Sequence, residues 1–349
     1  MSQHQSKKRI GLMTGGGDAP GLNGIIEATV CALRGTAVEL VGICDGFEGI
    51  YSGSTVQLTP EGVRGFHGAA GTLLGTSNKS GTRGREAEFL KAYGNLKLDG
   101  LIAAGGDGTF EGLSRVIQGL KLIGVPKTID NDLAGTDVTF GFDTACAVVA
   151  EAVDALRATA DAHRRVIVVE TMGRTSGWIA LGGGLASYAD VILIPEMPAS
   201  REKLKANILS LRGQGRRGVM VVVGEGACFQ GEKPRVAFRV PGSPQAERYG
   251  GIAEEIARWI EAETGWESRH VVLGHLQRSR HPTTTDRFIT ASMGVEVARM
   301  VTEGDWGKAV VVRGGLVTRA PLSDIMKPAR LVTPDHRWVN VARSLGLFI

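Results

Sequence analysis

The sequence predicts an α/β protein built from two doubly wound, mostly parallel sheets. Short apolar runs alternate with helix-length segments along most of the chain, and this alternation is typical of parallel strands joined by helices. Fifty of the 349 residues are glycine, about twice the usual ~7%. These glycines cluster directly after the apolar runs, where tight strand-to-helix turns occur. One sheet rarely takes nine strands over this length, so we expect two domains.

The expected strands are runs that are apolar at successive positions, as in parallel strands covered by helices on both faces. They comprise residues 9–14, 37–44, 100–104, 120–125, 165–170, 191–194, 219–223, 271–274 and 309–313. The expected helices comprise residues 21–33, 110–118, 145–159, 176–187, 201–212, 249–264 and 286–302. Residues 230–248 show no clear periodicity and are expected to form a long surface insertion. We expect the domains to divide near Asp143.

Composition excludes several classes of partner. The net charge is only +4 and the basic residues are spread along the chain, so no nucleic-acid-binding patch is expected. Cys31, Cys44, Cys146 and Cys228 lack CxxC spacing, which is typical of free thiols in a reducing compartment. No apolar run reaches the ~18 residues that span a membrane, and residues 1–14 lack the apolar segment of a signal peptide. We therefore expect a soluble cytoplasmic protein with no membrane partner.

Two glycine-rich turns follow predicted strands, where ligands of α/β sheets bind. The first is TGGGDAPGLN at residues 14–23, and the second is AAGGDGTFEGL at residues 103–113. Glycines allow backbone N–H groups to point at an anion, and a helix N-terminus favours negative charge. The first turn lacks the GK[ST] of a Walker A loop, so a turn required only by packing explains it equally well.

The second turn contains an acid, Asp107, among its glycines, and we expect Thr109 to cap the helix that follows. Mg²⁺ beside phosphates takes one or two carboxylates, so Asp107 is a candidate magnesium ligand. The alternative interpretation is a simple turn residue.

The stretch GVPKTIDND, residues 124–132, brings two carboxylates and a cation together after a strand. Alternate positions of an extended segment face the same way, so Thr128, Asp130 and Asp132 are expected to converge. A carboxylate here can accept a proton from a substrate hydroxyl. The alternative is an Asx-rich turn whose acids are solvated.

Two further polar segments complete the set of candidate site residues. In ETMGRTSG, Arg174 lies at a strand-to-helix junction, where a cation stabilises transition-state charge; the alternative is a surface salt bridge. In residues 268–287, Arg269, His275, Arg278 and Arg280 bracket a strand end, and this density of donors favours a phosphomonoester clamp. For His275 alone, a hydrogen-bonded structural role is the better interpretation. Together the segments predict phosphoryl transfer to a phosphorylated small molecule.

GGDGT, PKTIDND, ETMGR and GHLQR, in this order and spacing, resemble the phosphofructokinase family, whose members use ATP or pyrophosphate. GGDGT is shared with NAD kinases and lipid kinases, whereas the other three motifs are specific in combination. The resemblance covers residues 9–302 approximately and implies two α/β domains with the active site in the cleft between them. Residues 1–143 and about 276–325 would bind the phosphate donor and Mg²⁺. Residues 144–275 and about 326–349 would bind the sugar phosphate.

The resemblance also implies a role for each site residue. The donor phosphates would be held by Gly16, Gly17, Asn78, Lys79, Gly106, Asp107, Gly108, Thr109 and Lys127, with Mg²⁺ on Asp107. Asp130 would be the base for the 1-hydroxyl of fructose 6-phosphate, assisted by Thr128 and Asp132, with Arg174 near the transferring group. The sugar phosphate would be bound by Met172, Gly173, Glu225, His275 and Arg278. Arg165 and Arg269 would act in a neighbouring subunit, which implies an obligate homo-oligomer, a dimer or a tetramer.

The phosphate donor is decided by two positions that disagree. Pyrophosphate-dependent members of the family carry an acid at the position of Gly108, in space that the α-phosphate of ATP needs, so glycine favours ATP. They also carry a lysine at the position of Lys127, but a lysine is compatible with either donor. We expect ATP as the donor and keep pyrophosphate as the alternative. A non-catalytic sugar-phosphate sensor is disfavoured because such a protein needs no base.

Three positions depart from the family pattern. Glu27 stands where many bacterial members have an arginine for a nucleotide effector, so we expect little allosteric response to ADP or phosphoenolpyruvate. Asn78, followed by Lys79, stands where an arginine usually bridges donor and acceptor phosphates. Arg280 adds a cation beside the predicted phosphate clamp and bears on the choice of acceptor.

Overall fold

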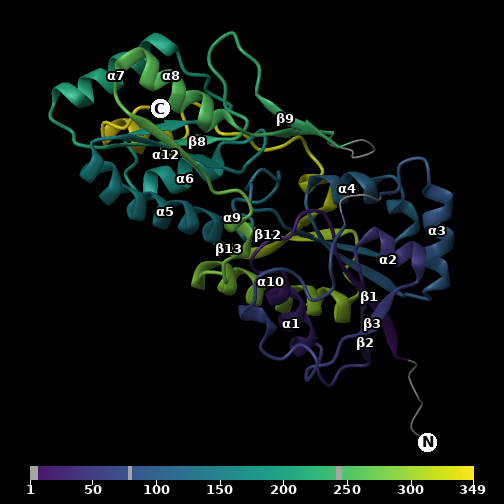
Figure 1. Ribbon diagram of the computed structural model, residues 1–349. Helices are drawn as coiled ribbons and strands as arrows, with labels where there is room; N and C mark the ends of the chain where they lie inside the picture. Colours follow the sequence, from purple (N-terminus) through teal and green to yellow (C-terminus); the bar gives the residue numbers. More distant parts are fainter. Residues whose placement is uncertain (1–6, 78–80, 241–245) are drawn as a thin grey trace, which may run out of the picture. The chain divides into compact units, whose positions relative to one another are not determined.

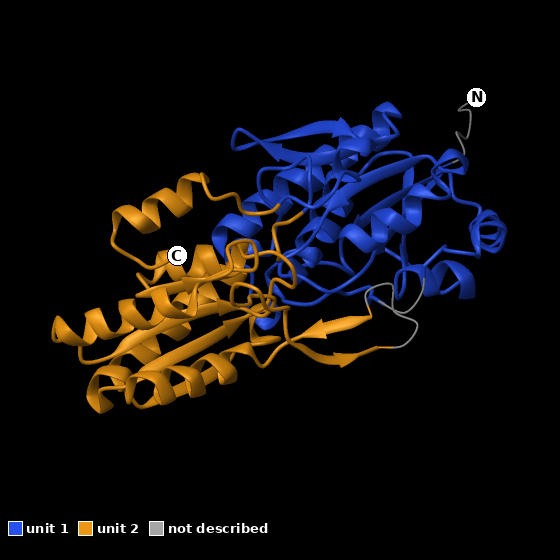
Figure 2. Ribbon diagram, turned by 90° about the horizontal axis from the view of Figure 1, so that it is seen from above, with its two compact units in different colours: residues 1–129, 133–143, 278–330 blue, residues 130–132, 144–277, 331–349 orange. Residues whose placement is uncertain are grey.

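The computed structural model describes residues 7–77, 81–240 and 246–349, and it contains two compact α/β units (Figure 1). Unit 1 comprises residues 1–129, 133–143 and 278–330, and unit 2 comprises residues 130–132, 144–277 and 331–349 (Figure 2). The expected assignment of one domain to the donor and one to the sugar phosphate stays a prediction.

The described part of unit 1 contains a seven-stranded, mostly parallel sheet. Its strands are β1 (Lys8–Thr14), β2 (Val38–Ile43), β3 (Thr55–Gln57), β4 (Gly100–Gly105), β5 (Leu122–Pro126), β12 (Lys308–Arg313) and β13 (Leu316–Pro321). They lie in the order β13-β12-β5-β4-β1-β2-β3. The five inner strands pair in parallel, and β3 and β13 close the two edges in antiparallel pairs. The carboxyl ends of β1, β4 and β5 therefore meet at one end of the sheet.

Helices cover both faces of this sheet, which is why its strands are apolar at successive positions. The helices of unit 1 are α1 (Leu22–Ala32), α2 (Phe47–Ser52), α3 (Glu86–Asn95), α4 (Asp107–Ser114), α10 (Thr284–Glu303) and α11 (Leu322–Ile325), with short 3₁₀ helices at Phe66–Gly68 and Ile117–Gly119. Ile102 and Ala104 of β4 pack with α1 and α10, whereas Leu101 and Ala103 pack with α2, α3 and α4. The alternation of side chains along β4 thus supplies two separate cores.

The main sheet of unit 2 has four strands and is parallel throughout. Its strands are β6 (Val166–Thr171), β7 (Val191–Leu193), β8 (Val219–Gly224) and β11 (Ser268–Val272), in the order β11-β6-β8-β7. The helices here are α5 (Phe142–His163), which begins in unit 1, α6 (Trp178–Ala186), α7 (Arg201–Gly213), α8 (Ile252–Thr264), α9 (Leu276–Ser279), which ends in unit 1, and α12 (Arg337–Ser344). α7 and α8 share a core with one face of the sheet. On α6, Gly183 and Gly184 lie against Val149 of α5 and Ile192 of β7.

The predicted fold class is confirmed, and a strand forms at or next to each of the nine predicted runs. Residues 230–248 were expected to form a long surface insertion, and the two antiparallel strands β9 (Val236–Arg239) and β10 (Glu247–Tyr249) were not predicted. β11 begins at Ser268 instead of 271, because its first residues are polar but pair with β6. The edge strands β3 and β13 have few successive apolar residues and were not predicted.

Membrane-spanning helices are absent from the described residues, since none of the helices there is both long and apolar enough to cross a bilayer. The four cysteines are free thiols.

Candidate functional site

Two glycine turns lie side by side at the carboxyl end of the sheet of unit 1. They are the β1–α1 loop, residues 15–21, and the turn from β4 into α4; Thr14 of β1 pairs with Ala104 of β4. A Cβ atom at Gly15 would lie 2.6 Å from the Thr109 side chain, and one at Gly105 would lie 2.4 Å from it. Both glycines are therefore required by packing, and they allow the two turns to approach closely around Thr109.

The β1–α1 loop has its carbonyl groups covered by side chains. Thr76 Oγ1 donates to the carbonyl of Gly16, the Lys127 ammonium to that of Gly17, and the Arg278 guanidinium to that of Asp18. Within the described part of the chain, the N–H groups of Gly16, Gly17 and Asp18 have no hydrogen-bond partner. A loop with occupied carbonyls and unpaired amides has the electrostatic character of an anion-binding site.

Lys127 connects the two glycine turns. It follows β5 and is 2% exposed. Its N–H donates to the carbonyl of Gly105 at 2.9 Å, and its ammonium donates to the carbonyl of Gly17. Lysine at this position therefore has a structural role in holding the β1–α1 loop that does not depend on which phosphate donor is bound.

The second glycine turn carries the candidate magnesium ligand on its first helical residue. α4 begins at Asp107 with Gly106 as its N-cap, so the expectation that Thr109 caps this helix was wrong. Thr109 is inside the first turn and buried against Gly15 and Gly105. A Cβ atom at Gly108 would meet nothing within 4 Å. Packing therefore does not require glycine at this position.

The donor set at this turn fits magnesium bound mainly through phosphates. Asp107 is exposed at the N-terminus of α4. Groups of three or more His, Cys, Asp or Glu side chains that would form a protein cage for a metal are absent from the described residues. Mg²⁺ bound to a phosphate donor needs one or two carboxylates and takes its other ligands from phosphate and water. Asn78 and Lys79, expected nearby, lie outside the described residues.

The segment after β5 does not have the extended geometry on which its predicted convergence rested. Asn131 has φ 54°, in the left-handed region, so the alternation of Thr128, Asp130 and Asp132 along one face was wrong as a geometric premise. Residues 130–132 pack with unit 2, whereas Thr128 belongs to unit 1. The Asp130 carbonyl accepts a hydrogen bond from Ser176 Oγ at 3.1 Å.

In residues 172–177, the β6–α6 loop, three N–H groups are bound by side chains of unit 2. Gln277 Oε1 accepts from the N–H of Met172 at 3.3 Å, Glu225 Oε1 from that of Arg174 at 2.9 Å, and Glu196 Oε1 from that of Gly177 at 3.0 Å. Arg174 has φ 54°, and a Cβ atom at Gly226 would lie 1.9 Å from its carbonyl oxygen. The loop therefore depends on contacts with several other segments of unit 2.

Sequence reasoning assigned no role to three residues of this arrangement: Ser176, Glu196 and Gln277. Gln277 is fully buried, and its amide also donates to the Gly274 carbonyl at 3.0 Å. Glu196 accepts from the N–H of Val332 at 3.0 Å as well. An acid directly after β7 was the available signal for Glu196. Burial raises the pKa of the Glu196 carboxyl, and the N–H groups of Gly177 and Val332 oppose that rise.

Arg174 and His275 lack the contacts that their alternative interpretations require. Arg174 forms no ion pair with any described residue, and its Nε is buried without a hydrogen bond there. His275 is exposed beyond the end of β11, and its ring forms no hydrogen bond within the described chain. Neither a surface salt bridge for Arg174 nor a hydrogen-bonded structural role for His275 is therefore supported.

The two arginines expected to serve a neighbouring subunit share one carboxylate. Arg165 and Arg269 contact Glu267 Oε1 at 2.9 and 2.5 Å. Hydrogen bonding from Arg165, with further attraction from Arg269, lowers the pKa of Glu267. Arg165 precedes β6 and Arg269 is the second residue of β11. Both thus lie at the amino ends of their strands, whereas the β6–α6 loop follows the carboxyl end of β6.

Glu27 is engaged within unit 1. Its two carboxylate oxygens accept from the N–H groups of Gly65 and His67 at 2.9 and 2.7 Å, and the His67 ring lies 2.9 Å away. Burial raises the pKa of Glu27, but these hydrogen bonds outweigh burial and the pKa is lowered overall. The carboxylate therefore fixes the turn around residues 65–67.

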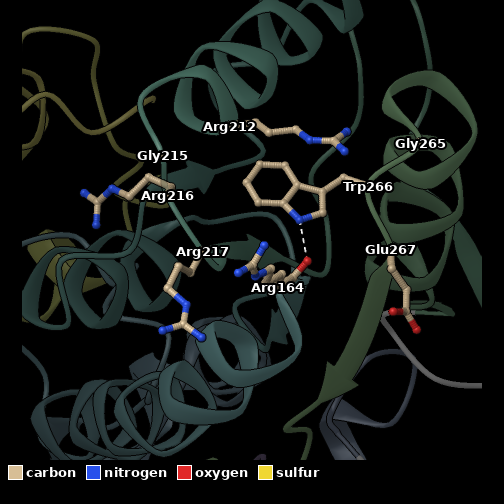
Figure 3. A pocket seen from close by; sticks show the side chains of 8 residues that line it. All are labelled: Arg164, Arg212, Gly215, Arg216, Arg217, Gly265, Trp266 and Glu267. Carbon is tan, nitrogen blue, oxygen red and sulfur yellow. Dashed lines mark hydrogen bonds between the residues drawn. The ribbon is translucent and has the colours of Figure 1, made fainter.

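A basic cavity of about 520 Å³ lies at the amino ends of β6, β8 and β11, away from the β6–α6 loop (Figure 3). Its lining consists of Arg164, Arg212, Gly215, Arg216, Arg217, Gly265, Trp266 and Glu267. α5, α7 and α8 all end beside it. Arg212 donates to the Thr264 carbonyl at 3.1 Å, and Trp266 Nε1 to the Arg164 carbonyl at 2.6 Å. Cations at helix C-termini are favourable, so a structural role accounts for these arginines.

Comparison with known proteins identifies the family. The sequence model described as Phosphofructokinase matches residues 9–301. The ATP-dependent 6-phosphofructokinase of Chloroflexus aurantiacus is 42% identical over 353 residues, which cover 98% of this chain and 97% of that protein. The pyrophosphate–fructose 6-phosphate 1-phosphotransferase of Streptomyces coelicolor is 40% identical over 337 residues, which cover 94% of this chain and 96% of that protein.

Solved structures agree with the sequence comparison. Phosphofructokinase from Pichia pastoris in the T-state matches with a TM-score of 0.82 and 30% identity over 93% of this chain. This chain spans 36% of the length of the Pichia chain. The motifs, the two sheets and the full-length relatives lead to the same result: this chain belongs to the phosphofructokinase family.

Proposed function

We propose that this protein transfers the γ-phosphoryl group of ATP to the 1-hydroxyl of fructose 6-phosphate and forms fructose 1,6-bisphosphate. The observation that carries the proposal is the β1–α1 loop, whose carbonyls are covered by Thr76, Lys127 and Arg278 while three successive N–H groups are unpaired among the described residues. The helix N-terminus at Asp107 adds a second positive end beside it. These two features suit the phosphates of a donor.

ATP is favoured as the donor because of Gly108. A side chain there would meet no described atom within 4 Å, so the fold tolerates a larger residue, and glycine leaves room for an α-phosphate. Lys127 is compatible with either donor, and its ammonium also binds the Gly17 carbonyl. Pyrophosphate stays the second candidate, because the relative from Streptomyces coelicolor named for it is nearly as similar as the one from Chloroflexus aurantiacus named for ATP.

The proposed reaction moves one proton and one phosphoryl group. The carboxylate of Asp130 takes the proton of the 1-hydroxyl, the hydroxyl oxygen forms a bond to the γ-phosphorus, and the bond from that phosphorus to the β-phosphate oxygen breaks. Thr128 and Asp132 orient the hydroxyl, and Arg174 stabilises the charge on the transferring group. Asp107 would hold Mg²⁺, which neutralises phosphate charge when bound.

The sugar phosphate is assigned to Met172, Gly173, Glu225, His275 and Arg278. Of these, Arg278 contacts the Asp18 carbonyl and Glu225 contacts the Arg174 N–H, so both have protein partners that a bound sugar would add to or replace. We further propose a homo-oligomer, because Arg165 and Arg269 lie at the opposite end of the unit 2 sheet from the β6–α6 loop. Their role in a neighbouring subunit is consistent with that position. The free cysteines support a reducing, cytoplasmic location.

The deciding experiment is a donor comparison on purified protein with Mg²⁺ and fructose 6-phosphate. We expect fructose 1,6-bisphosphate to form with ATP and at least tenfold more slowly with pyrophosphate at equal concentration. Turnover with pyrophosphate alone would overturn the donor assignment but keep the acceptor. Absence of turnover with both donors, together with binding of fructose 6-phosphate by calorimetry, would replace the enzyme by a sugar-phosphate sensor.

A further inference from the structure

The hydroxyl of Ser176 contacts two segments, the one after β5 and the β6–α6 loop. The proposed reaction depends on their relative position. Ser176 is 1% exposed. Its Oγ lies 3.1 Å from the carbonyl of Asp130 and 3.2 Å from that of Gly173. One carbonyl belongs to the proposed base, and the other to the β6–α6 loop assigned to the sugar. A single buried hydroxyl therefore contacts both segments.

Ser176 is itself held firmly. Its N–H donates to the Gly173 carbonyl at 2.9 Å, which closes a tight turn over residues 173–176. A Cβ atom at Gly173 would lie 2.4 Å from the Ser176 carbonyl oxygen, and Gly173 has φ 135°. The next residue, Gly177, is fixed by Glu196. The hydroxyl is thus presented from a backbone with few alternative conformations.

The Asp130 side of this contact carries backbone strain. Asn131, directly after Asp130, has a left-handed backbone with φ 54°, a conformation that costs energy for a non-glycine residue and needs surrounding contacts to persist. Residues 130–132 pack with unit 2 although the residues on either side of them belong to unit 1. A hydrogen bond from Ser176 to the Asp130 carbonyl helps to hold this short segment in unit 2.

We infer that Ser176 is a positioning residue: its hydroxyl fixes the Asp130–Asn131 peptide against the β6–α6 loop and so sets the base relative to the sugar. The inference rests on the proposed function, because it concerns the position of the proposed base. Ser176 contacts neither donor nor sugar in this role and acts through Asp130. Loss of its hydroxyl removes a buried donor from two carbonyls and frees the Asp130 peptide to shift.

The test compares Ser176→Ala with Ser187→Ala. Ser187 is a matched control in the same unit, since it is 6% exposed and its Oγ donates to the carbonyls of Gly183 and Gly184 at 2.8 and 3.3 Å within α6. Both variants lose a buried serine hydrogen bond and should lose similar thermal stability. We expect kcat to fall about tenfold in Ser176→Ala, with KM for fructose 6-phosphate within about threefold because the other loop contacts stay. Ser187→Ala should keep the wild-type kcat.

A third variant separates the hydroxyl from packing. Ser176→Thr keeps the hydroxyl and adds a methyl group to a buried site, so it should lower the melting temperature but restore most of the kcat. Equal kcat in Ser176→Ala and Ser187→Ala, or failure of a folded Ser176→Thr to recover activity, would overturn the positioning role alone. The kcat values of the variants and of the wild type are compared with the phosphate donor that the wild type uses. A wild type inactive with both donors would overturn the proposed function and this inference together.

Discussion

The β1–α1 loop of unit 1 and the β6–α6 loop of unit 2 satisfy their backbone groups in opposite ways. In the β1–α1 loop, side chains such as Lys127 and Arg278 donate to carbonyls, and three successive N–H groups have no partner among the described residues. In the β6–α6 loop, Gln277, Glu225 and Glu196 accept from N–H groups. Mainly cationic side chains bind the carbonyls of the β1–α1 loop, whereas two carboxylates and one side-chain amide bind N–H groups of the β6–α6 loop.

This difference indicates which part of the site depends on its ligand. Unpaired amides are costly once water is removed from them, so the β1–α1 loop gains its missing partners when an anion binds. In the β6–α6 loop the N–H groups of Met172, Arg174 and Gly177 are paired before any sugar arrives, and these contacts favour a preorganised loop. Donor binding should thus stabilise unit 1, whereas changes near the β6–α6 loop should affect chemistry.

The largest effect is expected for Asp130→Asn, which removes the proposed base. The backbone of this residue is bound by Ser176 of the β6–α6 loop. The amide keeps the size of the carboxyl group but cannot take the proton, so kcat should fall by about 10²–10⁴-fold. KM for fructose 6-phosphate and the melting temperature should stay close to wild type, because the Ser176 hydrogen bond goes to the Asp130 backbone. Steady-state kinetics and thermal unfolding measure the two effects.

Asp154→Asn is the control for Asp130→Asn, since Asp154 is exposed on α5. It should behave as wild type in both assays. A loss of less than tenfold in kcat for Asp130→Asn would place the base elsewhere. A large rise in KM or a loss of stability would show that the Asp130 side chain also holds the segment after β5 in place.

An intermediate effect is expected on the donor side, from Gly105→Ala compared with Gly108→Ala. The new Cβ at Gly105 would meet buried Thr109 at 2.4 Å, whereas the one at Gly108 meets nothing within 4 Å. Overpacking of this kind costs typically about 1–3 kcal/mol. Gly105→Ala should therefore lose that much unfolding free energy and raise KM for ATP, and Gly108→Ala should change stability by under about 0.5 kcal/mol. Urea unfolding with and without ATP measures both.

Equal free energies of unfolding for Gly105→Ala and Gly108→Ala would contradict the packing of the glycine turns around Thr109. A rise in KM for fructose 6-phosphate equal to that for ATP in Gly105→Ala would also contradict the assignment of the β1–α1 loop to the donor.

Much of the fold was predictable because apolar runs report burial on both faces. β4, Gly100–Gly105, is buried throughout. Its continuous apolar sequence predicts this burial without knowledge of the neighbouring strands. β11 begins with Ser268 and Arg269, which are polar and became strand only through pairing with β6. β9 and β10 likewise became strands by pairing with each other. Strands specified by neighbours instead of by their own composition were therefore missed or shifted.

The sequence motifs predicted the candidate site residues, but not the hydrogen bonds that connect them to the rest of the protein. GGDG and TIDND marked the turns because their residue types are unusual after a strand. The roles of Ser176, Glu196 and Gln277 arise from contacts across 46, 19 and 105 positions of sequence, respectively, and no local pattern encodes such contacts. Local dihedrals also escaped prediction: the left-handed Asn131 removed the basis for alternation along residues 128–132.

The smallest effect is expected from Glu196→Gln, and it is a pH dependence of stability. Burial raises the pKa of Glu196 in the folded protein, so the folded state holds this proton more tightly than the unfolded chain. The associated stability is fully present below the unfolded pKa and is lost as the pH rises through the folded pKa. Glutamine does not ionise, so residue 196 adds no pH dependence to the stability of Glu196→Gln. Relative to Glu196→Gln, the wild type should therefore become less stable as the pH rises above about 4.3, the ordinary pKa of an unfolded glutamate.

Glu27→Gln provides the control of opposite sign, because hydrogen bonds from Gly65 and His67 lower the Glu27 pKa despite its burial. Stability from Glu27 is present above the unfolded pKa and is lost as the pH falls through the folded pKa. The stability of the wild type relative to Glu27→Gln should therefore increase as the pH rises towards about 4.3, the ordinary pKa of an unfolded glutamate. Urea unfolding of both pairs at several pH values measures the two slopes. Slopes of the same sign would mean that the hydrogen bonds from Gly177 and Val332 outweigh burial at Glu196, so that burial does not set the pKa of this carboxyl.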